Sequence, residues 1–223
     1  GELCTTRFNC QLHGAKGSVY EGGIRVPALL RWPAGLPGQS DCHAMVHFTD
    51  WFPTLLAMAG IQVPVGTGED AFRVQMGHCT TRPLDGANLL PMLRGERDQG
   101  PTQRFWQWNR YTPLVTCNAA VRDGDWKLVR PAIREAMQVP DIQYLDVSMY
   151  NPEYLIEHGI LRGEPERDVP PPPTPELYNL AEDPLEQRNL ADVYPGRVQA
   201  LLRQLETWFE EVDAERRTIA DDV

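Results

Sequence analysis

The sequence lacks features that would place it in a membrane or on a nucleic acid. It contains no run of about 18 apolar residues, the length that a helix needs to cross a bilayer. Positive charge is scarce, because 21 basic residues face 31 acidic ones and the formal net charge is −10. Such a field repels polyanions, so any anionic ligand must be held by local cations. We therefore expect no membrane span and no nucleic-acid partner.

Common catalytic and metal-binding signatures are also missing. The sequence contains no HExxH, GxSxG, GxxxxGK[ST] or GxGxxG. Its five cysteines are odd in number, follow no CxxC or Cys/His metal spacing, and neither demand nor exclude disulfides. The chain begins without Met, and its first residues lack the order of a signal peptide, so we expect that an upstream segment with any export signal is missing.

The first part of the chain predicts elements of an α/β domain. Residues 24–30 form a mostly apolar run, which favours a strand buried on both faces, as in a parallel sheet. A second strand is predicted at 44–48. A helix capped by Thr49 or Asp50 follows and runs to Ala59, because these side chains can accept a hydrogen bond from an early free N–H.

The rest of the chain predicts a smaller unit made of strands and one long helix. A turn and a short helical segment at 85–93 end at Gly95, and the composition then shifts, which indicates domains at 1–95 and 96–223. An apolar stripe at helical spacing predicts a helix at 195–217 that packs on a small sheet. Strands are predicted at 105–108, 119–122, 126–129 and 176–180, with Asp123-Gly124 as a hairpin turn between the second and third.

A glycine-rich loop around Lys16 is the strongest local signal for chemistry. Glycines at 14, 17, 22 and 23 indicate a tight loop whose backbone approaches another group closely. A lysine held in such a loop before a strand is suited to binding an oxyanion, since strand ends of α/β sheets host ligands and a fixed ammonium stabilises negative charge. The alternative is a solvated loop lysine.

The segment that contains this loop resembles type I sulfatases. It reads Leu12-His13-Gly14-Ala15-Lys16-Gly17-Ser18-Val19-Tyr20-Glu21-Gly22-Gly23-Ile24-Arg25-Val26-Pro27. Further matches are the stretches 31–35, 49–60, 85–95, 120–128 and 176–186. The resemblance implies an alkaline-phosphatase-like α/β sulfatase fold, here incomplete, with a small C-terminal antiparallel sheet packed by a terminal helix.

The same resemblance implies hydrolysis of aryl or carbohydrate sulfate esters. In this family a formylglycine, made from the Cys or Ser of a C/S-x-P-x-R motif, acts beside calcium. Lys16 corresponds to the catalytic lysine that contacts the sulfate group and the leaving oxygen. His13, where the family more often has Arg, is a candidate substrate-binding residue, and a solvated loop histidine is its alternative. The chain lacks C/S-x-P-x-R, so we expect the nucleophile and the calcium ligands in a missing N-terminal half and an inactive fragment.

Several other residues admit two interpretations. Glu21 and Arg25 are predicted to form an ion pair that locks the loop, with a catalytic role as the alternative. The aromatic and polar cluster at 106–111 is predicted to be strand core, with a substrate cleft as the alternative. The acidic residues expected to be caps or turn residues are Asp50, Asp85, Glu182, Asp183 and Glu186.

Two alternative functions stay open at this point. The chain could be a noncatalytic remnant that binds or supports another protein, because half of a catalytic domain is absent. It could also belong to a phosphoester or phosphonate hydrolase of the same superfamily, since one fold hosts several reactions. The resemblance implies an exported (periplasmic or extracellular) or lysosome-like location.

Overall fold

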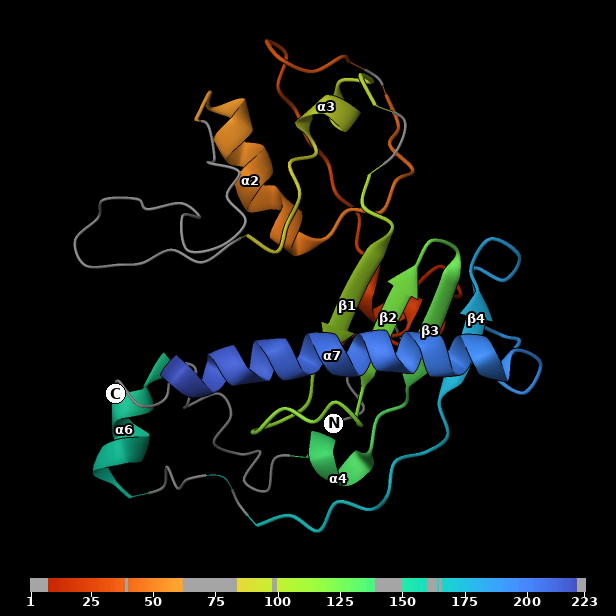
Figure 1. Ribbon diagram of the computed structural model, residues 1–223. Helices are drawn as coiled ribbons and strands as arrows, with labels where there is room; N and C mark the ends of the chain where they lie inside the picture. Colours follow the sequence, from red (N-terminus) through yellow and green to blue (C-terminus); the bar gives the residue numbers. More distant parts are fainter. Residues whose placement is uncertain are drawn as a thin grey trace. The chain divides into compact units, whose positions relative to one another are not determined.

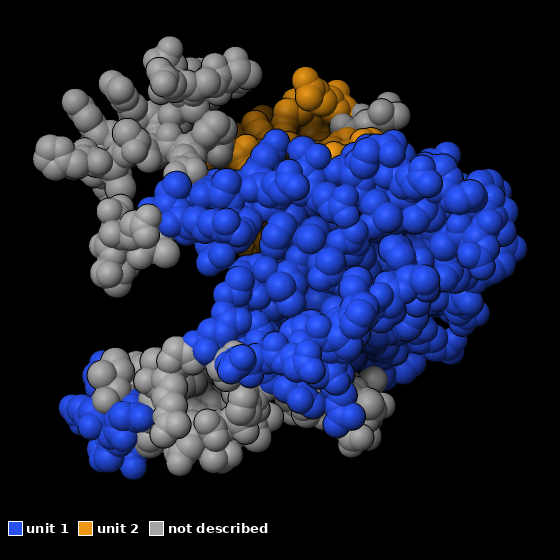
Figure 2. All heavy atoms as spheres, turned by 60° about the horizontal axis from the view of Figure 1, so that its bottom comes forward, with its two compact units in different colours: residues 1–26, 105–223 blue, residues 27–104 orange. Residues whose placement is uncertain are grey.

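The computed structural model divides the chain into two compact units. Unit 1 comprises residues 1–26 and 105–223, and unit 2 comprises 27–104 (Figure 2). The predicted domain division after residue 95 concerns the domains of a longer protein and stays a prediction. The structure describes residues 8–38, 40–61, 84–97, 100–138, 150–159, 164 and 166–219.

Unit 1 is built around a four-stranded sheet with the strand order β1-β2-β3-β4 (Figure 1). β2 pairs with β3, and β3 with β4, in antiparallel fashion. All four strands were expected from the sequence, with ends that differ by one or two residues. Their bounds are β1 (Gln103–Gln107), β2 (Ala119–Asp123), β3 (Trp126–Arg130) and β4 (Glu176–Asn179).

The hairpin between β2 and β3 lies one residue later than predicted. Asp123 pairs with Trp126, so the two loop residues are Gly124 and Asp125. Gly124 has φ +60°, a left-handed conformation that glycine adopts without steric cost. The favoured two-residue hairpin turns require positive φ at the first loop position, which places this glycine there.

The terminal helix covers one face of the sheet, as predicted. α7 (Pro195–Ile219) crosses the strands in Figure 1 and buries Leu201 and Leu205 against apolar residues of the sheet. The ring of Trp208 stacks on Phe105 with ring centroids 5.0 Å apart. The sheet residues at the centre of this core are Ala119, Val121, Leu128 and Leu177.

The segment that carries Lys16 packs on the opposite face of the sheet. Side chains alternate between the two faces of a strand, so the neighbours of the α7-facing residues point away from α7. There Ala120, Val129 and Tyr178 form a second core with Val19. The sheet is therefore covered by α7 on one side and by the N-terminal segment on the other.

Shorter helices complete unit 1. α1 (Glu21–Ile24) follows the Lys16 segment, α4 (Arg134–Met137) follows β3, and α6 (Pro152–Glu157) precedes β4. Cys117 is buried beside Ile133 and Ala136 of the α4 region. No helix in the described ranges combines the length and apolar character that a bilayer crossing requires.

The two strands predicted at 24–30 and 44–48 do not form in the structure of this 223-residue chain. Residues 25–30 are irregular, and Leu29 is fully exposed. Residues 44–47 are also irregular, and Phe48 begins a helix. A strand needs a neighbour to satisfy its backbone groups, and within the part of the chain that the structure describes no strand pairs with either segment.

Unit 2 contains α2 (Phe48–Met58) and α3 (Leu90–Leu93). His47, and not the predicted Thr49 or Asp50, caps α2. Its side chain accepts a hydrogen bond from the Thr49 N–H, while the Asp50 carboxylate reaches back to the His47 N–H at 2.8 Å. Asp50 is fully buried and also forms an ion pair with Arg104. The acidic residue therefore completes the capping box instead of starting the helix.

Candidate functional site

The candidate site is the lysine loop, which we define as residues 12–23. Its backbone folds back on itself, because the Ser18 N–H donates to the Ala15 carbonyl at 2.9 Å and the Gly22 N–H donates to the His13 carbonyl at 2.7 Å. A Cβ atom at Gly22 would overlap the carbonyl oxygens of His13 and Gly14 at the start of the loop. The loop therefore depends on glycine where its two ends approach each other.

Lys16 and His13 share this loop but have different surroundings. The Lys16 side chain is exposed and makes no hydrogen bond or ion pair with the residues that the structure describes. Lys16 lines neither the cavity around Trp32 nor the one around Thr112. The His13 ring stacks on Tyr20 at 3.9 Å, and its Nδ1 lies 3.2 Å from the Glu186 carbonyl oxygen. One side of the His13 ring is thus packed on the protein although the residue is exposed like Lys16, and the predicted roles of both residues stay predictions.

A buried ion triad fixes the end of the lysine loop. The Lys127 ammonium on β3 lies 2.9 Å from the Glu21 carboxylate and 2.8 Å from that of Glu186, and its side chain is 0% exposed. The Glu21 N–H also donates to the Glu186 carboxylate at 2.7 Å. Burial raises the pKa of Glu186, and the ammonium of Lys127 opposes that shift. The triad joins the loop to β3 and to the segment after β4.

This triad corrects one sequence-based interpretation and adds a role to another. Glu21 does lock the loop, but its partner is Lys127, while the Arg25 side chain is exposed. Glu186 does lie in a turn, as expected, since its N–H donates to the Asp183 carbonyl, and its side chain is 2% exposed because it also joins the triad. The sequence did indicate that Lys127 would be buried. Side chains alternate along β3, so Lys127 lies on the face of the sheet that does not carry Leu128. A lysine on a strand between buried apolar residues needs an acidic partner.

Asn118 forms a second fixed point of the loop, which the sequence analysis missed. Its side-chain oxygen accepts a hydrogen bond from the Val19 N–H at 3.1 Å, and its side-chain nitrogen donates to the carbonyls of Gly17 and Trp108 at 2.9 and 2.6 Å. Asn118 is 1% exposed and has φ +48°, a conformation that Asn tolerates better than most residues. The amide thus ties the residue next to Lys16 to the end of β1.

A pair of tyrosines anchors the middle of the same segment. The hydroxyls of Tyr20 and Tyr178 both donate to the Glu176 carboxylate, at 2.6 and 2.8 Å. Burial first, and then the acceptor carboxylate, raise the pKa of both phenols, so each keeps the proton that it donates. The lysine loop is therefore held to the sheet at several positions around Lys16.

The predicted aromatic cluster after β1 divides into two parts. Trp106 packs against the core beneath the lysine loop, as expected for strand core. Trp108 and Tyr111 remain about 40% exposed, and each ring has an arginine over it, Arg110 and Arg167 respectively. The cleft interpretation therefore stays open for the exposed pair and does not apply to Trp106.

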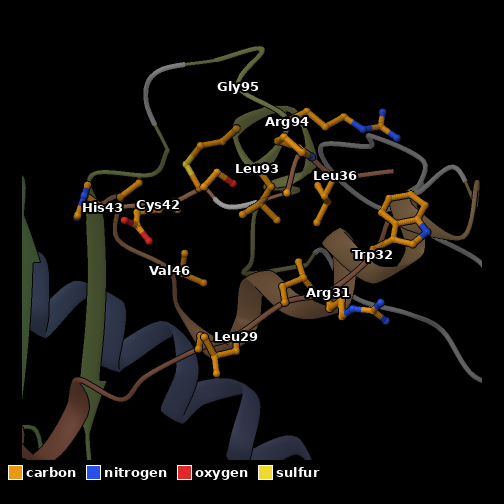
Figure 3. Close-up of a pocket in the computed structure, with 18 of the residues that line it drawn as sticks. Leu29, Arg31, Trp32, Leu36, Cys42, His43, Val46, Leu93, Arg94 and Gly95 are labelled. Carbon is orange, nitrogen blue, oxygen red and sulfur yellow. The ribbon is translucent and has the colours of Figure 1, made fainter. Parts of the chain in front are cut away.

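The described residues do not supply a metal site. No group of three or more His, Cys, Asp or Glu side chains lies close enough together in the described ranges to hold an ion. Among those residues there is thus no cluster of the acidic oxygen donors that calcium prefers. A cavity of about 1040 Å³ in unit 2 is lined by Arg31, Trp32 and Arg94 among others and contains none of the predicted site residues (Figure 3).

The fold and the lysine loop together define a class of protein. A small sheet covered by a terminal helix, with a glycine-rich lysine loop on its other face, is the C-terminal part of an alkaline-phosphatase-like sulfatase fold. Residues 13–144 match the family model described as N-sulphoglucosamine sulphohydrolase, C-terminal. The chain belongs to this family, as the C-terminal part of a type I sulfatase.

Individual relatives agree with this assignment. Arylsulfatase A of Bos taurus is 31% identical over 216 residues, which are 95% of this chain and 34% of the relative. Arylsulfatase J of Mus musculus is 27% identical over 202 residues, 88% of this chain and 31% of the relative. The chain thus spans about a third of the length of the curated relatives it matches.

A solved structure supports the fold. It comes from a study of the metabolism of multiple glycosaminoglycans by Bacteroides thetaiotaomicron and superposes with a TM-score of 0.56 at 24% identity. The superposition covers 89% of this chain and 32% of the solved chain. At that level of identity the likeness shows the fold alone.

Proposed function

We propose that the protein to which this chain belongs hydrolyses sulfate esters, and that the chain contributes Lys16 to the active site. The observation that carries the proposal is the sulfatase-like segment from Leu12 to Pro27, whose lysine loop is fixed to the sheet by Asn118 and Lys127. Family membership supports the same reaction class. The nucleophile, a formylglycine, and the calcium ligands are proposed to lie in a preceding part of the protein.

Lys16 suits the role of an oxyanion ligand. Its ammonium has no carboxylate partner among the described residues, so its charge is available to a substrate. In the proposed reaction the ammonium contacts the sulfate oxygens and the departing ester oxygen, where negative charge develops. His13, three residues away on the same loop, is proposed as a weaker contact at the edge of the site.

The proposed substrates are aryl or carbohydrate sulfate esters. The relatives are named arylsulfatases, and the matching family model is named for a sulphoglucosamine hydrolase. Since the chain spans about a third of its relatives, we propose that it is inactive alone. By its family resemblance the protein is proposed to be exported or to work in a lysosome-like compartment.

Kinetics of the full-length protein test this function. With an aryl sulfate and calcium present, Lys16→Ala is expected to lower kcat by about 10²- to 10³-fold, as for loss of a single oxyanion donor. The control is Arg203→Ala, which removes an exposed cation of α7 and should leave kcat unchanged. Aryl phosphate serves as the competing substrate.

Two results would reject the proposed function. One is a full-length reading frame without a C/S-x-P-x-R motif. The other is an intact protein that turns over aryl phosphate but neither an aryl sulfate nor a sulfated sugar, which would favour the phosphoester alternative.

A further inference from the structure

We propose that Asn118 is a positioning residue for the sulfatase reaction, acting through the lysine loop to fix the place of Lys16. The inference rests on the proposed function, because it assigns a task to the loop that carries the proposed oxyanion ligand. Asn118 lies between β1 and β2, about a hundred residues along the chain from the loop that it holds.

The contacts of Asn118 surround the backbone just after Lys16. The amide nitrogen donates to the carbonyl of Gly17, the residue next to the lysine, and the amide oxygen accepts from the N–H of Val19. The same amide nitrogen donates to the carbonyl of Trp108, so one side chain joins two separate stretches of backbone. Gly17 itself, with φ +93°, lies beside Trp108, because an added Cβ atom would be 3.5 Å from the edge of its ring.

The other attachments of the loop are farther from Lys16 in sequence. His13 contacts the Glu186 carbonyl oxygen on one side, and Glu21 joins the Lys127 triad on the other. Neither of them contacts Gly17. Because Gly17 lacks a side chain and has positive φ, its own backbone preference gives little resistance to movement. Ser18 holds Ala15, the residue before Lys16, from within the loop, and the Asn118 hydrogen bonds supply the restraint from the sheet on Gly17, the residue after it.

Only an amide meets the chemical demands at position 118. The site needs one acceptor for an N–H and donors for two carbonyls, which an Asn side chain provides and an ionised Asp does not. An aspartate would place its negative charge against the carbonyl oxygens of Gly17 and Trp108. Asn and Asp both tolerate the left-handed backbone, so Asn118→Asp changes the donors without changing the backbone preference.

A double-mutant cycle in the full-length protein tests the proposal. Asn118→Gly removes the side chain and keeps the left-handed backbone accessible, and we expect kcat for an aryl sulfate to fall about 10- to 100-fold, as for a misplaced catalytic group. In a Lys16→Ala background the same change should lower kcat by less than about twofold. A smaller kcat loss in the Lys16→Ala background is expected only if Asn118 acts through the lysine.

Controls separate positioning from general stability. Asn189→Gly removes an Asn whose side chain accepts hydrogen bonds from the N–H groups of Leu177 and Ala191 and contacts no part of the lysine loop, and kcat should stay within about twofold. Asn118→Asp should reproduce the kcat loss of Asn118→Gly, and it carries the test if the glycine variant does not fold. Thermal melting of each variant confirms that folded protein is assayed.

The possible results are distinct. Equal losses from Asn118→Gly with and without Lys16, or an unchanged kcat in both Asn118 variants, would overturn the positioning role while leaving the proposed function in place. An intact protein that hydrolyses no sulfate ester would overturn both.

Discussion

Unit 1 and unit 2 differ in how completely they bury their apolar side chains. In unit 1, Leu177 and Leu205 are 0% exposed, and the sheet has a packed core on each face. In unit 2, Leu29 is fully exposed and Phe48 is 73% exposed. Unit 1 therefore buries a core on each face of its sheet, whereas unit 2 buries Leu89 and Leu90 but leaves Leu29 and Phe48 exposed.

Antiparallel and parallel strands differ in how they find a partner strand, and this difference separates the sheet of unit 1 from the predicted strand at 24–30. The antiparallel strands β2 and β3 are joined by a two-residue loop, so each finds its neighbour within a few residues. Parallel strands need crossover connections and partners from distant parts of the chain. The apolar run at 24–30, predicted as a strand of a parallel sheet, has no such partner in the described residues and stays irregular.

The largest effect should come from the ion triad that unit 1 buries. Lys127→Met would leave the carboxylates of Glu21 and Glu186 together without a cation, and we expect a loss of about 3 to 5 kcal/mol in the free energy of unfolding. Urea denaturation measures it. Glu186→Gln is the control and should cost much less, because Lys127 keeps Glu21 as its partner. Equal losses in the two variants would show that the charge balance is not what stabilises the triad.

A leucine pair tests the contrast between the two cores directly. Leu205→Ala should destabilise the 223-residue chain by about 2 to 5 kcal/mol, because it leaves a cavity between α7 and the sheet. Leu29→Ala should change the stability of the same chain by less than about 0.5 kcal/mol, since the side chain is exposed.

In the full-length protein, Leu29→Ala should instead be strongly destabilising. There we expect Leu29→Ala to cost as much as a core leucine, because the run at 24–30 then has strands beside it. A negligible effect of Leu29→Ala in both proteins would contradict the view that this segment is a strand of the complete fold.

Sequence patterns were sufficient where the signal was local. The apolar stripe predicted α7 to within two residues at its C-terminal end, and the Asp123-Gly124 pair predicted the β2–β3 hairpin to within one residue. The cap of α2 was missed because His47 is not a common capping residue, and its role depends on Asp50 reaching back to its N–H.

The site was predicted only in part, because its supports are distant in sequence. The loop with Lys16 is visible as a contiguous motif, but Asn118, Lys127 and Glu186 contact it from positions about 100 to 170 residues away. A lone Asn before a strand carries no sign of such a contact. Of the three, only Lys127 could be inferred to be buried, because the alternation of side chains along β3 sets the face on which it lies.

The smallest expected effect is a difference in how the two units respond to acid. Burial, with Arg104 nearby, lowers the pKa of His47, and the carboxylates of Asp50 and Asp85 only partly offset this. A histidine whose folded pKa is depressed contributes stability that is present above its unfolded pKa, about 6.5, and lost as the pH falls through the folded value. Protonation also removes the ring nitrogen that accepts from the Thr49 N–H.

The stability of unit 1 should change in the opposite direction when the pH falls. Folding raises the pKa of Glu186. Its contribution to the folding stability is therefore present below its unfolded pKa, about 4.3, and is lost as the pH rises through the folded value. Between pH 7 and pH 5 we therefore expect α2 amides to lose protection from hydrogen exchange, by about 1 kcal/mol for a lost cap, while β3 amides keep or gain it. His47→Asn, which caps without titrating in this range, should abolish the α2 response. If α2 and β3 instead weaken together in acid, the two units do not differ in the way that their buried groups predict.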